Sequence, residues 1–94
     1  GKSRYVILQE LPTEMGEKYT RVLHDALLTI DQGQNILVIR TVPGMAMGVA
    51  AALDALNWEE ILGSIAGDDT VMCVARTLEE ASSVAERLKS ILQK

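Results

Sequence analysis

With 94 residues and a net charge of −4, the chain has the size of one small domain. Its negative net charge argues against a strongly basic surface that would bind phosphates on this segment. Nearly half of the residues (48%) are apolar and phenylalanine is absent, so aliphatic side chains supply the core. A domain this small covers such an apolar content poorly by itself, which favours association with other subunits.

Cysteine content and apolar runs indicate the compartment. The single cysteine, Cys73, cannot form an internal disulfide, and its apolar neighbours favour a packed thiol over a reactive one. No apolar run reaches the roughly 20 residues that cross a bilayer. We therefore expect a cytoplasmic protein that does not bind a membrane.

The predicted elements begin after Pro12, because this proline interrupts regular structure. Residues 1–12 are interpreted as an arm or linker, and residues 13–94 as one domain. Within Glu14–Leu23 we expect one or two helical turns, with Thr13 as the N-cap.

A first β-hairpin is expected next, from strands Ala26–Gln32 and Ile36–Val42 around a turn that contains a glycine. In its first strand, Ala26, Leu28 and Ile30 would share one face, because alternate residues of a strand point the same way.

A helix is predicted for Gly44–Leu56, after a break at Pro43-Gly44. One face has apolar residues at helical spacing and should pack on the sheet: Met45, Val49, Ala52, Leu53 and Leu56. The opposite face is also small or apolar, although the exposed face of a monomer is normally charged. We therefore expect a subunit interface there, formed by Met47, Ala50, Ala51 and Asp54. The alternative is a helix buried within this domain.

A second hairpin should follow, because Ile61-Leu62 and Val71–Ala75 are typical of short, buried strands. We place its bend at Gly67-Asp68, with Gly67 at the positive φ of a two-residue turn. Asp68 and Asp69 would then stand side by side at the end of the sheet. Neighbouring carboxylates raise each other's proton affinity and are stabilised by a cation.

Several roles fit such an acid pair. It could act as general acid and base, bind a divalent metal, receive a guanidinium group or merely satisfy the turn. Catalysis is disfavoured, because no third polar cluster and no nucleophile or phosphate-loop motif accompanies the pair. A metal site is disfavoured because further oxygen ligands are missing nearby. A guanidinium receptor and a simple turn remain.

The last helix should start after Thr77, which forms a capping box with Glu80. Its expected buried stripe is Leu78, Ala81, Val84, Ala85, Leu88, Ile91 and Leu92. The order strand–strand–helix–strand–strand–helix predicts an α+β, two-layer sandwich of ββαββα type. Its four-stranded sheet is mainly antiparallel, with two helices on one face.

Three segments closely resemble the C-terminal domain of bacterial arginine repressors: Arg40–Ala46, Leu53-Asp54 and Gly63–Thr70. The last of them, Gly-Ser-Ile-Ala-Gly-Asp-Asp-Thr, is the most specific. The resemblance runs from about Leu23 to the end of the chain and implies the same ββαββα fold.

The resemblance also implies a hexamer built from two trimers, with L-arginine at the trimer–trimer interface as corepressor. Asp68 and Asp69 match the arginine-binding aspartates, and Asp54 matches another acidic contact. Ser64 and Ala66 lie in the strand that frames the pocket. Met47 stands where several relatives have glutamine or histidine, which hydrogen-bond the ligand better than methionine does.

Members of that family carry an N-terminal winged helix-turn-helix that contacts operator DNA, and it is absent from these 94 residues. Arg4–Leu8 is interpreted as the remnant of its last wing strand. The expected function is the effector-binding and hexamerisation domain of an arginine-responsive transcriptional regulator, with L-arginine as effector, no cofactor and no enzymatic activity. The alternative is a structural oligomerisation module that no longer responds to a ligand.

Overall fold

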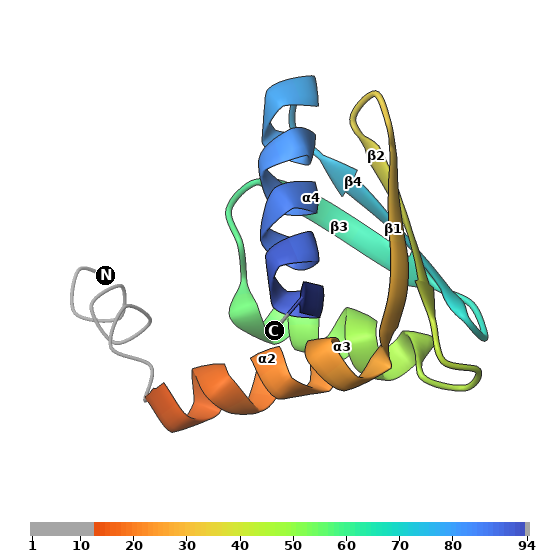
Figure 1. The fold of residues 1–94 in the computed structure, drawn as a ribbon. Helices are drawn as coiled ribbons and strands as arrows, with labels where there is room; N and C mark the ends of the chain where they lie inside the picture. The colour runs from red at the N-terminus through yellow and green to blue at the C-terminus, as the bar shows by residue number, and fades with distance from the viewer. Residues whose placement is uncertain (1–12, 94) are drawn as a thin grey trace.

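A computed structural model of the protein describes residues 13–93. Its elements are α2 (Thr13–Ala26), β1 (Leu27–Gly33), β2 (Ile36–Thr41), α3 (Ala46–Leu56), β3 (Ile61–Ala66), β4 (Thr70–Ala75) and α4 (Leu78–Gln93). The strands form one antiparallel sheet in the order β1-β2-β4-β3. Helix α4 covers one face of this sheet, and α2 and α3 lie across its lower end (Figure 1).

The α+β sandwich is confirmed, with α2 as a further helix ahead of the predicted ββαββα order. The interpretation of residues 1–12 falls outside the part of the chain that the structure describes. Within residues 13–93, no helix combines the length and the apolar character needed to cross a membrane.

Helix α2 is longer than the one or two turns expected. Its apolar residues recur at helical spacing, with Leu23 and Ala26 buried and Tyr19 and Val22 partly buried against the core. The helix packs against α3 and α4. Ala26 was expected to begin a strand, but it is the last residue of this helix.

The predicted face of β1 is wrong at Leu28, which is 53% exposed. The pairing of β1 with β2 shifts register between Leu27 and Thr29. Such an irregularity adds a residue to one strand and reverses the side to which the next side chain points. Leu27 and Ile30 face the core instead.

Helix α3 starts two residues later than predicted, and this changes which side chains it buries. Met45 is the N-cap residue and is partly exposed, whereas Ala46 is fully buried. Val49, Ala52 and Leu53 are buried as expected, and Leu56 is partly buried against the core.

Helix α4 begins as predicted, because the backbone N–H of Glu80 donates to Thr77 Oγ1 at 3.0 Å. The Glu80 side chain does not complete the predicted capping box, since its Oε1 is buried without a hydrogen-bond partner among the described residues. Most of the expected stripe is buried: Ala81, Val84, Ala85, Leu88 and Ile91. Leu92 is partly buried against the core, and Leu78, in the first turn, is about half exposed. Arg87 of this helix lies over the Trp58 ring and pairs with Glu60 at 2.9 Å, so Trp58 is a packing anchor.

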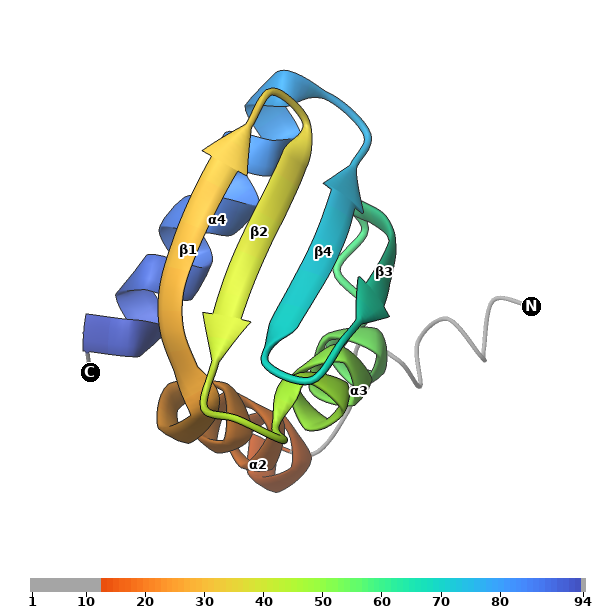
Figure 2. The same ribbon diagram turned by 90° about the vertical axis from the view of Figure 1, so that its right-hand side faces the viewer.

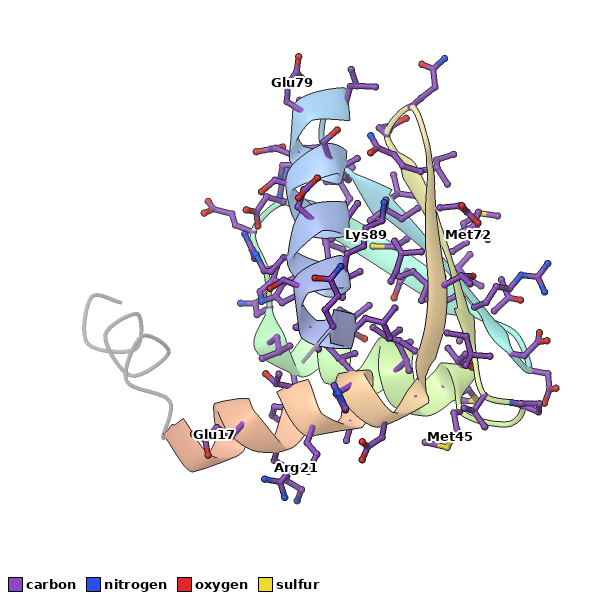
Figure 3. The ribbon with its side chains drawn as sticks, viewed as in Figure 1. Glu17, Arg21, Met45, Met72, Glu79 and Lys89 are labelled. Atoms are coloured by element: carbon purple, nitrogen blue, oxygen red, sulfur yellow. The ribbon has the colours of Figure 1, made fainter. Side chains whose placement is uncertain are left out.

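The other face of the sheet carries no helix (Figure 2). Large apolar side chains stand on it, with Ile65 76% and Leu62 58% exposed, and Met72 points away from α4 (Figure 3). The expectation that the strands around the acid pair are buried is therefore wrong for this outer face.

Candidate ligand-binding site

The acid pair lies at the tip of the β3–β4 hairpin, beside the N-terminus of α3 (Figure 2). The backbone N–H of Gly67 donates to the Thr70 carbonyl at 2.7 Å, which closes the turn around Asp68 and Asp69. The bend is thus one residue later than predicted. Gly67 does not have a positive φ; among residues 13–93, Gly44 is the glycine that does, at 83°.

Three backbone hydrogen bonds dock this turn on the connection between β2 and α3. The Asp69 carbonyl accepts from Thr41 N at 2.8 Å. The Asp68 carbonyl accepts from Gly44 N at 3.1 Å and from Ala46 N at 3.3 Å. The main chain makes these contacts, whereas the Asp68 carboxylate is exposed and the Asp69 carboxylate is about half exposed. They are also next to the positive end of the α3 dipole, which favours anionic groups.

The two carboxylates have different surroundings. Thr70 Oγ1 donates to Asp69 Oδ1 at 3.0 Å, and Arg40 Nη1 lies 4.0 Å from Asp69 Oδ2. The exposed Asp68 side chain has no hydrogen-bond or ion-pair partner in the described part of the chain. Asp68 is thus the carboxylate that an outside cation reaches with least competition.

The remaining predicted site residues occupy two elements. Met47 is 73% exposed in the first turn of α3, near the aspartate turn. Asp54 is exposed on the same helix, eight residues beyond Ala46 and thus about 12 Å farther along its axis. No hydrogen bond or ion pair joins Asp54 to Asp68 or Asp69 within residues 13–93.

Ser64 and Ala66 are partly buried residues of β3. Ala66 packs against the core, and Ser64 is paired with the buried Cys73 across the sheet. Of the predicted interface residues, Ala51 is exposed and Ala50 is half-buried against the chain's own core.

Burial raises the pKa of the Cys73 thiol to about 11, and the charge of Asp54 adds to this effect. At neutral pH the thiol is therefore protonated and packed, as the sequence indicated. No group of three or more metal-binding side chains occurs among residues 13–93.

Sequence reasoning missed an apolar hollow of about 380 Å³ on the uncovered sheet face. It is lined by Leu62, Gly63, Ser64, Ile65, Met72 and Val74. Alternation along β4 could have placed Met72 on the face opposite to the buried Val71 and Cys73. Ile65 lies on the same outer face, because it is paired directly with Met72. The lining of the hollow contains neither aspartate of the turn, but it includes Ser64, one of the predicted ligand contacts.

Comparison with known proteins gives consistent results. A family described as "Arginine repressor, C-terminal domain" matches residues 23–90. A curated arginine repressor of Lachnoclostridium phytofermentans is 50% identical over 98% of this chain and 60% of its own length. That of Lachnospira eligens is 46% identical over 98% and 61%. That of Staphylococcus aureus (strain JH9) is 42% identical over 81% and 51%. The chain thus spans about 60% of the length of the first two relatives.

Proposed function

Because the chain belongs to the family of arginine repressor C-terminal domains, a family of transcription regulators and not of enzymes, we propose that it binds L-arginine and assembles the repressor. The observation that carries this proposal is the Asp68-Asp69 turn, which is held by its main chain while the Asp68 side chain is exposed and the Asp69 side chain is about half exposed.

Guanidinium is the cation that suits this turn. Its planar, paired N–H donors match carboxylates in two-point contacts, and it keeps its charge at every physiological pH. Asp68, which has no partner within residues 13–93, is the principal receptor in this proposal, and Asp69 and Met47 flank it. Asp54, on another part of α3, contacts the ligand from a neighbouring subunit or at its other end.

Self-association is supported by two apolar surfaces. The uncovered sheet face exposes large aliphatic side chains around Ile65 and Met72, and a contiguous apolar patch of this kind usually marks an interaction surface. A second copy of this chain is its proposed occupant. The exposed side of α3, with Met47, Ala51 and Asp54, is the second surface. Together they could build trimers and join trimers into a hexamer.

Ligand binding and assembly are coupled in this proposal. Carboxylates from several subunits repel one another when trimers meet, and arginine placed between them removes this repulsion. A ligand that binds the assembled form better stabilises it, and assembly in turn tightens ligand binding.

Operator DNA would be contacted by another part of the intact protein. The curated relatives are longer than this chain, and the chain's net charge of −4 disfavours binding of phosphates by this domain. Repression of genes for arginine synthesis, with arginine as corepressor, is the proposed role of the whole.

One observation favours a second candidate function, a structural oligomerisation module without ligand response. Met47 is the most exposed methionine of the described chain and lies near the aspartate turn. A thioether donates no hydrogen bond and accepts only weakly, so Met47 contributes less to a polar ligand than an amide would.

Calorimetric titration of the protein with L-arginine separates the two functions. We expect binding that weakens at least tenfold in Asp68→Asn, because a charge-assisted two-point contact is lost. Citrulline, which is neutral where arginine is charged, should not compete. Asp31→Asn removes an exposed acid of β1 and serves as the matched control with unchanged affinity. An unaltered affinity in Asp68→Asn would contradict the proposed receptor, and no heat with the unmodified protein would favour the structural module.

A further inference from the structure

The two neighbouring aspartates are not equivalent in their contacts. Asp69 Oδ1 accepts a hydrogen bond from the Thr70 hydroxyl at 3.0 Å, and its Oδ2 lies 4.0 Å from Arg40 Nη1. Asp68 has no comparable side-chain contact in the part of the chain that the structure describes. One acid of the pair therefore already faces a guanidinium group that belongs to the protein itself.

Strand pairing fixes this arrangement. Arg40 of β2 is paired with Thr70 of β4, the residue directly after Asp69. The next residue of the chain, Thr41, donates its backbone N–H to the Asp69 carbonyl at 2.8 Å. Arg40 thus stands on the exposed side of the sheet, within reach of Asp69 for as long as β2 and β4 stay paired.

The contact is loose. A separation of 4.0 Å is too long for a hydrogen bond, and the Arg40 and Asp69 side chains are 59% and 47% exposed. Exposed ion pairs of this kind contribute little to stability and are screened by salt. An incoming cation can therefore displace Arg40 from Asp69 at small cost.

We infer that Arg40 is an internal competitor for the guanidinium group of the ligand. In the ligand-free protein Arg40 partly neutralises Asp69. A ligand guanidinium bound at the same carboxylate is repelled by the positive charge of Arg40. This inference rests on the proposed function, because it takes a guanidinium compound as the ligand of the aspartate turn. Its consequence is that Arg40 lowers ligand affinity and so sets the arginine concentration at which the domain responds.

The test compares two variants that remove one positive charge each. Arg40→Gln should bind L-arginine roughly two- to fivefold more tightly in calorimetry, the range expected of an exposed ion pair. Arg76→Gln is the matched control, because Arg76 follows β4 at its opposite end, roughly 20 Å from the turn, where its Nε donates to the Glu59 carbonyl at 2.9 Å. Its affinity should stay that of the unmodified protein. Unchanged or weaker binding in Arg40→Gln would overturn the inference.

A double-mutant cycle shows whether the effect acts through Asp69. With Asp69→Asn already in place, Arg40→Gln should no longer tighten binding, because the carboxylate for which it competes is gone. An equal gain in both backgrounds would mean a general charge effect and would contradict direct competition.

A ligand-free measurement keeps this inference separate from the proposed function. In the absence of arginine, Asp69→Asn should shift the Arg40 guanidinium resonances in NMR spectra, whereas Asp54→Asn should leave them in place. No shift on Asp69→Asn, with normal arginine binding, would overturn the role of Arg40 alone. Failure of the unmodified protein to bind arginine, with the shift present, would overturn the proposed function and leave of this inference only the ion pair between Arg40 and Asp69.

Discussion

At the scale of single residues, Asp68 combines two tasks. Its carbonyl accepts hydrogen bonds from Gly44 and Ala46 and ties the hairpin tip to the start of α3. Its carboxylate is then held at a defined place without being used by the chain, as a preorganised receptor requires. A substitution of Asp68 that keeps the main chain in place therefore removes the charge but keeps these backbone hydrogen bonds.

Gly44 and Gly67 allow a test of this contact between the hairpin tip and the β2–α3 connection. Gly44 has φ of 83°, where a side chain is strained, so Gly44→Ala should lower the free energy of unfolding by about 1 kcal/mol. Gly67 has ordinary φ, and an added Cβ would lie 3.7 Å from the Thr70 carbonyl oxygen, an ordinary contact. Gly67→Ala should change stability by less than about 0.5 kcal/mol. Urea unfolding of both variants measures this, and an equal loss in both would contradict the account of the turn.

The sequence placed the acid pair on a hairpin turn but predicted the geometry of that turn only in part, and its role as a cation receptor stays a prediction. Two adjacent acids after a glycine indicated a cation receptor, which needs only residue types. Which glycine takes a positive φ depends on how the β2–α3 connection meets the hairpin, and that is a contact between distant segments. The same holds for Arg40, whose approach to Asp69 follows from the register of β2 and β4.

At the scale of elements, α4 was predicted most accurately, because both its start and its stripe are local properties. Thr77 caps the helix and the apolar period continues from Ala81 to Ile91. The start of β1 was predicted least accurately, because the irregularity after Leu27 reverses the expected alternation. Helix α2 was underestimated since its stability depends on packing against α3 and α4.

The N-cap of α4 can be tested directly. Thr77→Ala removes the acceptor of the Glu80 N–H and should lower the free energy of unfolding by about 1 kcal/mol. Ser83→Ala, at an exposed position of the same helix, is the control and should be neutral or slightly stabilising. Denaturant unfolding of the two variants suffices. If Thr77→Ala were as stable as the control, the hydrogen bond would not define the helix start.

At the scale of the whole molecule, the main feature is a sheet with one face covered by the core and the helices and the other face left uncovered. Strands that are apolar on both faces are ordinarily interpreted as buried on both faces, and that interpretation fails for a single copy of this chain. The prediction that its apolar excess belongs to a subunit interface stays a prediction, now with the outer sheet face as a further surface that carries it (Figure 2).

The most direct test of the central claim is molar mass by light scattering behind a sizing column, over a dilution series, with and without millimolar L-arginine. Coupled binding and assembly predict that arginine lowers the protein concentration at which hexamers separate into trimers by at least tenfold, and that citrulline does not. The same dissociation curve with and without arginine would contradict the account and leave a structural module whose aspartates only form a turn.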